Sequence, residues 1–116
     1  MLPKINRLKT KKDIDRVFKK GIGVKEGFLI LKAVKSDLKN PRFAFIVSQK
    51  VSKKATLRNK IRRRLSGLVK QKLPGLRPGM DIVLVAAPGL AEKDFWEIDE
   101  TINKLFAKAK IFEGQK

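Results

Sequence analysis

The chemistry that the sequence can offer is concentrated in one run of cations. Residues 50–64 read KVSKKATLRNKIRRR and hold eight Lys or Arg side chains and no acidic one. Guanidinium groups bind phosphate through two parallel hydrogen bonds, and ammonium groups attract it as point charges. An ordinary soluble helix interleaves Glu or Asp among its cations. The run therefore predicts a surface that binds a polyanion.

This run is predicted to lie on a long helix over residues 52–73, with Ser52 or Thr56 as its N-cap. With Ile61 at the centre of the buried face and about 100° of rotation per residue, Arg63 points directly away from the core. The other cations lie on both flanks, so the whole exposed surface can meet phosphates from several directions. The apolar residues at helical spacing are Leu57, Ile61, Leu65, Leu68 and Val69.

The residue inventory excludes most bond-breaking chemistry by protein side chains. Among 116 residues there is no Cys and no His, so the chain has no disulfide, zinc finger, thiol nucleophile or imidazole base. A two-metal nuclease would need clustered carboxylates, whereas the acids outside the last predicted helix are few and scattered. We therefore identify no catalytic residue and no metal-ligating residue.

The charge balance strengthens the case for a polyanionic partner. Twenty-nine Lys or Arg against 11 Asp or Glu give a net charge of +18, and residues 1–64 alone carry 21 basic and 4 acidic side chains, a net of +17. Self-repulsion of this size destabilises a compact chain unless a polyanion relieves it. Nucleic acid is the expected partner, with an anionic membrane surface and a merely basic, solvated surface as the alternatives.

Nothing in the sequence predicts a membrane segment. No stretch approaches the roughly 18 to 20 uninterrupted apolar residues that span a bilayer. The basic N-terminus lacks the apolar block of a secretory signal, because charges interrupt it at Lys9, Lys11, Lys12, Asp13 and Asp15. We expect a cytoplasmic protein with no membrane partner.

The pattern of turns and apolar runs predicts one domain over residues 1–116, an α/β (α+β) two-layer sandwich in the order helix, strand, strand, helix, strand, helix. Thr10, with Asp13 three residues later, has capping-box spacing at the start of the first helix. The first two strands are expected to pair as an antiparallel hairpin, and the third, DIVLVAA, to be central. Phe95 is expected on the buried face of the last helix. The predicted ranges are 10–20, 28–34, 42–48, 52–73, 81–87 and about 91–113.

Three segments share their order and composition with one known family. FAFIVSQKVSKKATLRNKIRRRL combines a strand, a Ser-Lys-Lys-like turn and a helix that carries an Arg-Asn-Arg-like motif with further basic residues. INRLKTKKDIDRVFKKG precedes it as an opening helix, and DIVLVAAP follows it before an amphipathic C-terminal helix. Together these segments resemble the bacterial ribonuclease P protein component over nearly the whole chain, and their combination is specific.

The resemblance implies a function and a fold. The family's protein is the partner of a ribozyme: the RNA subunit removes the 5′ leader of precursor tRNA with Mg²⁺, and the protein binds that RNA and the leader. The chain would thus be an enzyme only as the protein component of a ribonucleoprotein endoribonuclease. The resemblance also implies a ribosomal-protein-like fold with a left-handed crossover around the long helix, although about 98% of such units are right-handed.

The same resemblance implies the partners of the chain. They are ribonuclease P RNA and precursor tRNA, with the protein as a monomer in a 1:1 ribonucleoprotein. No DNA partner is expected. No cofactor is expected on the protein's own side chains, because the Mg²⁺ serves the RNA-containing holoenzyme.

Carried over residue by residue, the resemblance assigns two surfaces. Lys60 stands where the family's motif has its second Arg, Gln49 where a Lys is usual, and Ile14 where an aromatic residue is common, which weakens the expectation of base stacking there. The residues expected to bind RNA are Arg7, Lys50, Lys53, Lys54, Arg58, Asn59, Lys60, Arg62, Arg63 and Arg64. The residues expected in a leader-binding cleft between the first helix and the sheet are Ile14, Phe18, Phe28, Ile30 and Lys32.

Two other functions remain open on the charge pattern alone. A general RNA-binding or ribosome-associated protein without a catalytic partner would show the same distribution of charge. A DNA-binding protein would place the basic helix in a major groove, although no helix-turn-helix spacing precedes this helix and no dimerisation element is visible.

Overall fold

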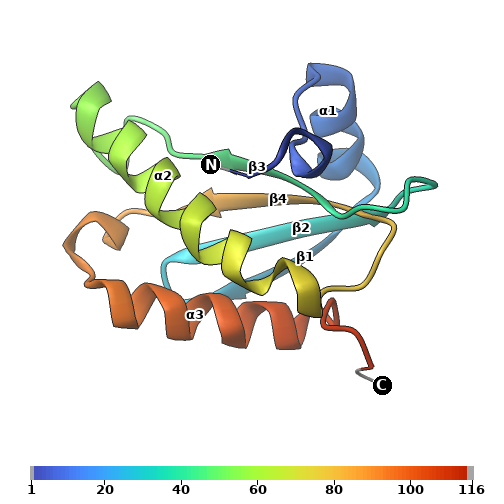
Figure 1. The fold of residues 1–116 in the computed structure, drawn as a ribbon. Coiled ribbons are helices and arrows are strands. Elements are labelled where there is room, and N and C mark those ends of the chain that lie inside the picture. The colour runs from blue at the N-terminus through green and yellow to red at the C-terminus, as the bar shows by residue number, and fades with distance from the viewer. Residues whose placement is uncertain (1, 115–116) are drawn as a thin grey trace.

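A four-stranded sheet with three α-helices makes up residues 2–114, the part of the chain that the computed structural model describes (Figure 1). The sheet order is β1-β2-β4-β3, with β2 antiparallel to both neighbours and β3 parallel to β4. The helices are α1 (Lys11–Lys20), α2 (Ala55–Lys72) and α3 (Phe95–Lys108). The strands are β1 (Ile22–Glu26), β2 (Leu29–Lys35), β3 (Arg42–Ile46) and β4 (Met80–Ala86). The 3₁₀ turns are η1 (Lys4–Asn6), η2 (Leu73–Gly75) and η3 (Leu90–Glu92).

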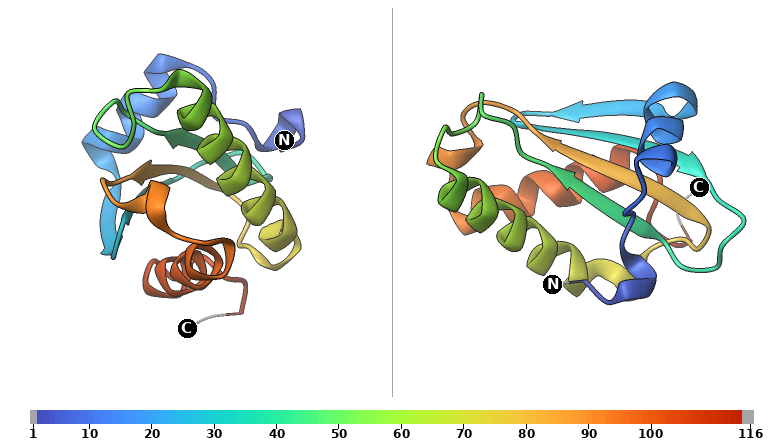
Figure 2. Two further views of the ribbon diagram at one scale, coloured as in Figure 1. Left: turned by 90° about the vertical axis from the view of Figure 1, so that its left-hand side faces the viewer. Right: turned by 90° about the horizontal axis from the view of Figure 1, so that it is seen from above.

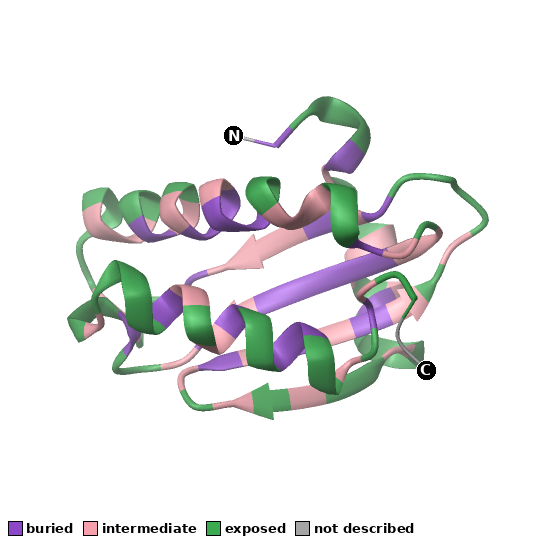
Figure 3. Ribbon diagram, turned by 60° about the horizontal axis from the view of Figure 1, so that its bottom comes forward, coloured by how far each residue is buried: buried purple, intermediate pink, exposed green. Residues whose placement is uncertain are grey.

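Helices cover the two faces of the sheet unequally. On one face α2 and α3 enclose the main core, to which the strands contribute Leu31, Phe43 and Leu84. On the opposite face α1 covers a smaller area, where its Val17 forms a second cluster with Val83 of β4 (Figure 2). The mixed α+β sandwich is confirmed, and α1 adds a partial third layer. The prediction of a central third strand is also confirmed, because β4 is buried on both faces (Figure 3).

The chain passes from β3 to β4 through a left-handed crossover. In Figure 1 both strands point to the left, α2 returns to the right in front of the sheet, and β4 lies below β3. Figure 2 shows from above that α2 lies on this one side of the sheet. The hand implied by the family resemblance is therefore present, and it places the N-terminal half of α2 beside the end of β3.

The strand pairing differs from the sequence prediction. The first two predicted strands, residues 28–34 and 42–48, correspond to β2 and β3. Their predicted pairing as a hairpin is wrong, because β4 lies between them. The link between β2 and β3 instead bonds to the residue before β4: Ser36 N–H donates to Gly79 O (2.7 Å), and Gly79 N–H donates to Lys39 O (3.2 Å). Gly79 has a φ of 72°, and a Cβ there would lie 3.0 Å from the Ser36 carbonyl oxygen. A glycine is required at this close approach.

The edge strand β1 is an addition to the predicted elements. Its sequence, IGVKE, alternates apolar residues with Gly and Lys and so lacks the apolar run of the other strands. It gains its place through pairing with β2 and packing against α3, where Glu26 binds Lys108 Nζ at 2.7 Å. Tertiary context decides its conformation.

The helix starts follow the sequence at α1 but not at α2. The Thr10 hydroxyl accepts a hydrogen bond from Asp13 N–H at 3.2 Å, as the capping-box spacing predicts. The N-cap of α2 is Lys54, which makes no side-chain capping bond, so the prediction of Ser52 or Thr56 as the cap is wrong. Ser52 lies in the turn before the helix, where its hydroxyl accepts a hydrogen bond from the N–H of the N-cap residue Lys54 at 3.2 Å.

The last helix starts later than predicted. Its N-cap is Asp94, whose carboxylate accepts from Glu97 N–H at 2.8 Å. Phe95 is 42% exposed and lies edge-on to Trp96, with 5.4 Å between ring centroids, so its expected place in the core is wrong. In the first turn of α3, Phe95 and Trp96 are exposed to solvent, whereas Ile98 packs into the core. The buried residues of the helix are Ile98, Ile102, Leu105 and Phe106.

Candidate nucleic-acid interface

A buried carboxylate ties α1 to the sheet. Asp81 of β4 is fully buried and accepts one hydrogen bond from Arg16 of α1 and two from Arg42 of β3, each at 2.8 Å. Hydrogen bonding to Asp81 raises the pKa of the Arg42 guanidinium above its ordinary value. Arg42 also reaches Asp13 of α1 at 3.5 Å. These contacts fix the position of α1 over one end of the sheet, and the sequence hints at them only through a lone acid at the start of an apolar strand.

The part of this face that α1 leaves uncovered, where the leader-binding cleft is predicted, carries a row of half-buried apolar residues. Ile30, Val85 and Ile46 lie in one row across β2, β4 and β3, and all three are half-buried. Phe18 of α1 borders the row and is 39% exposed, and Lys32 Nζ lies 5.6 Å from the centroid of its ring. An exposed ring, a cation and an apolar strip suit an unpaired base with its phosphate.

Four of the five residues predicted for the cleft lie on this face, and the fifth does not. Ile14 is half-buried and packs against the second cluster beneath α1. Phe18, Ile30 and Lys32 lie on the same face of the sheet, outside that cluster. Phe28 packs instead against the main core on the opposite face, and Lys93 Nζ lies 5.8 Å from its ring centroid. Phe28 belongs to the turn before β2, so the side-chain alternation of that strand does not extend to it.

The N-terminal half of α2 and the turn before it present the predicted cations to solvent. None of the 43 residues from Leu38 to Met80 is acidic. Within residues 2–114, six of the predicted cations make no side-chain hydrogen bond or ion pair with the protein, and all but the half-buried Arg64 are exposed. These six are Lys50, Lys53, Lys54, Lys60, Arg63 and Arg64.

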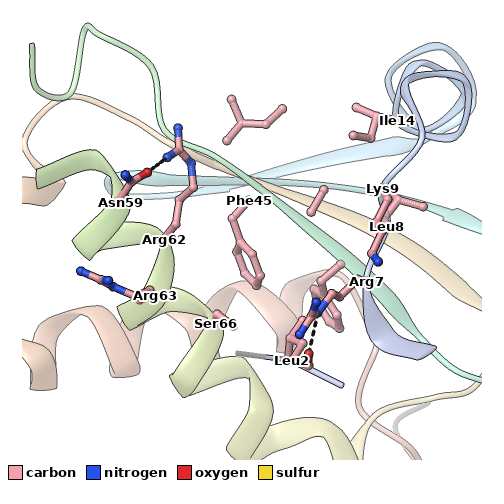
Figure 4. A pocket seen from close by; sticks show the side chains of 13 residues that line it. Leu2, Arg7, Leu8, Lys9, Ile14, Phe45, Asn59, Arg62, Arg63 and Ser66 are labelled. Atoms are coloured by element: carbon pink, nitrogen blue, oxygen red, sulfur yellow. Dashed lines mark hydrogen bonds between the residues drawn. The ribbon is translucent and has the colours of Figure 1, made fainter. Parts of the chain in front are cut away.

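The other two arginines of α2 also organise the backbone. Arg58 Nη1 donates to the carbonyls of Ser52 (2.9 Å) and Lys53 (3.0 Å). Arg62 Nη2 donates to Val47 O at 3.2 Å, and its Nη1 donates to the Asn59 amide oxygen (Figure 4). A guanidinium has five N–H donors, so both side chains keep donors for phosphate. They hold the end of β3 and the cationic turn against the helix.

A groove of about 520 Å³ runs along the outer edge of β3, between α2 and the N-terminal segment (Figure 4). Its floor includes Phe45 and Ile46, and four cations, from the N-terminal segment and from α2, line it. Arg7 is among them, and its Nε donates to Leu2 O at 2.7 Å. The four cations are Arg7, Lys9, Arg62 and Arg63.

The described residues offer neither a membrane span nor a metal cluster. No helix within residues 2–114 has the length and hydropathy to cross a bilayer. In the same part of the chain, no three His, Cys, Asp or Glu side chains gather as metal ligands would.

The sheet with its left-handed crossover and the acid-free cationic helix define a small α+β protein with a surface for nucleic acid. The model of the family Ribonuclease P matches residues 2–110. The ribonuclease P protein component of Rippkaea orientalis is 34% identical over 118 residues, which cover 97% of this chain and 93% of that protein. The chain belongs to the ribonuclease P protein family.

Solved structures support the same assignment. A mutant of the Staphylococcus aureus RNase P protein superposes with a TM-score of 0.88 at 25% identity, covering 94% of this chain and 92% of that one. The RNase P protein from Thermotoga maritima superposes with a TM-score of 0.77 at 28% identity, covering 85% of this chain and 94% of that one. Fold and sequence thus identify one family.

Proposed function

We propose that this chain is the protein subunit of ribonuclease P, that it binds the catalytic RNA through α2 and the turn before it, and that it holds the 5′ leader of precursor tRNA in the cleft beside α1. The observation that carries the proposal is the set of unpaired cations on an acid-free helix. Membership of the family gives this surface its partner, ribonuclease P RNA. The subunit thereby serves the maturation of tRNA 5′ ends.

The two surfaces adjoin, which suits one RNA-bound substrate. Ile46, the last residue of β3, lies in the cleft, and the chain continues directly into the cationic turn that contains Lys50 and Lys54. A single strand lying in the cleft therefore leads to the surface that binds the ribozyme. Phe18 and Lys32 supply the stacking ring and the cation for the leader.

In this proposal the protein positions RNA and the RNA breaks the bond. The chain contains no His and no Cys to act as base or nucleophile. Hydrolysis of the phosphodiester is therefore assigned to the RNA subunit and its Mg²⁺, in a complex with one copy of each subunit. The protein contributes affinity through counterion release and orientation of the leader.

Reconstitution tests the proposal. The protein is added to a bacterial ribonuclease P RNA at low Mg²⁺, and removal of the leader from precursor tRNA is followed over time. We expect faster cleavage than with the RNA alone, and no cleavage with the protein alone. No enhancement would favour the general RNA-binding alternative. Cleavage without the RNA subunit would refute the assignment of catalysis to RNA.

A further inference from the structure

We propose that the groove along the outer edge of β3 binds one unpaired nucleotide of an RNA, with the base on the apolar floor and its phosphate among the lining cations. The inference rests on the proposed function and adds a site to it. Ile14 borders both this groove and the cleft, but the groove continues round the edge of β3 to α2. The RNA-binding helix therefore forms one wall of the site.

The floor of the groove offers free backbone hydrogen-bonding groups. The N-terminal segment pairs with β3 only at its start, where Leu8 N–H donates to Phe43 O at 2.9 Å. In a parallel ladder every second residue turns its backbone groups to the same side, so the N–H and C=O of Phe45 point to this edge as well. No group within residues 2–114 bonds to them there. One donor and one acceptor side by side match the polar edge of a base.

The wall of the groove that α2 forms carries another free polar group. Ser66 of α2 lines the groove and is only 4% exposed. Its hydroxyl has no hydrogen-bond partner in the described part of the chain. Buried hydroxyls are nearly always satisfied, so a polar ligand in the groove would meet a group that needs one. The Ser66 hydroxyl and the Phe45 backbone thus approach the same space from two sides.

The size and charge of the groove favour a nucleotide. Its volume of about 520 Å³ lies in the range of small-ligand sites. No acid lines it, whereas Arg7, Lys9, Arg62 and Arg63 do. An extended peptide can also pair with an open strand edge, but four cations select a partner that carries phosphate. The nucleotide can come from the ribozyme or from the leader, so the experiment has one arm for each.

Two substitutions at Ser66 test the site without changing any charge. Ser66→Leu fills the groove, and Ser66→Ala removes only the hydroxyl. The control is Asn103→Leu, which places a leucine on the exposed face of α3. One arm measures the Kd for ribonuclease P RNA alone at several salt concentrations. The other measures the Kd of the reconstituted holoenzyme for precursor tRNA with and without its leader, and circular dichroism reports the fold of each variant.

We expect Ser66→Leu to weaken one arm by about 5- to 10-fold, Ser66→Ala by about 3-fold, and Asn103→Leu to leave both arms unchanged. For Ser66→Ala the slope of log Kd against log salt should stay the same, because this variant leaves the phosphate among the lining cations. Weakening of the first arm assigns the nucleotide to the ribozyme. Weakening that requires the leader assigns it to the substrate. Either result supports the site.

Unchanged affinity of both Ser66 variants in both arms would overturn the inference, with an extended peptide as the remaining candidate for the edge. If Ser66→Leu fails to fold, Ser66→Ala decides alone. Failure of the unmodified protein to bind ribonuclease P RNA would instead refute the proposed function. The two failures are therefore distinguishable.

Discussion

Asp81→Asn measures how strongly the buried carboxylate holds α1 to the sheet. The substitution preserves shape and removes the charge that faces Arg16 and Arg42. Removing one partner of a buried ion pair costs about 3–5 kcal/mol. The two arginine side chains are 38% and 19% exposed, so water partly compensates them. We therefore expect a loss of about 2–3 kcal/mol in the free energy of unfolding.

Urea unfolding followed by circular dichroism gives this free energy. Asp37→Asn is the matched control: it makes the same change in net charge, from +18 to +19, at an exposed position in the link between β2 and β3. Repeating both titrations at high salt separates local from global electrostatics. The loss at Asp81 should persist, because salt screens a buried pair far less than an exposed one.

A loss at Asp81 below about 1 kcal/mol, typical of an exposed pair, or equal to that of Asp37→Asn, would refute this reasoning. It would show that apolar packing of Ile14 and Val17 positions α1 without the ion pairs. The leader arm of the holoenzyme assay provides a second check. If α1 sets the width of the cleft, Asp81→Asn should weaken leader-dependent binding more than binding of ribonuclease P RNA alone.

Three further predictions concern the arginines of α2, the ring of Phe18 and the pair of Glu26 with Lys108. Arg63→Ala should reduce the salt slope of RNA binding by about 1 while changing the free energy of unfolding by less than about 0.5 kcal/mol. Arg58→Ala should lower both the slope and the free energy of unfolding, since Arg58 also holds the turn before α2. An unchanged slope in both variants would place the two arginines outside the interface. Phe18→Ala should lower the free energy of unfolding by about 1 kcal/mol or less and weaken leader binding. A sharp fall in Tm with unchanged leader discrimination would instead assign Phe18 to the core. The hydrogen bond from Lys108 lowers the pKa of Glu26 below its ordinary 4.5. The pair therefore stabilises the fold above that pH, and this stabilisation disappears as the pH falls through the folded-state pKa. Glu26→Gln should remove this part of the pH dependence of the free energy of unfolding in urea titrations, and an unaltered pH dependence would contradict the pairing.

The sequence predicts the elements that have a strong period or a clear end. The three helices and the buried run of β4 combine apolar spacing with caps or Pro-Gly breaks, and all four are present. The pairing of strands is less accessible, because it depends on where a link runs in space. Gly79 and the 36–41 link form backbone bonds that insert β4 between β2 and β3. No local pattern in the chain specifies that contact.

The site shows the same division. Residue type alone places the cations of α2 on an exposed surface, as the structure has them. Their individual roles depend on contacts with distant backbone, such as Arg62 with Val47, which no spacing predicts. The groove at β3 needs the open edge of one strand, the buried hydroxyl of Ser66 and the N-terminal segment in one place. Only the folded chain brings these together.

The distribution of ion pairs explains why one surface remains available to RNA. Within residues 2–114 the acids that form ion pairs do so with cations of α1, β3, α3 and the end of α2, or with Lys93, which precedes the N-cap of α3. None of these acids pairs with residues 50–64. Neighbouring cations of that segment therefore repel one another until an external anion approaches. RNA binding should then raise the stability of the protein by mass action. We expect ribonuclease P RNA to raise the Tm of the protein, and to raise it less for Arg63→Ala. This result would show that the cations of residues 50–64 bind the RNA. An equal rise in both proteins would show that the RNA binds elsewhere.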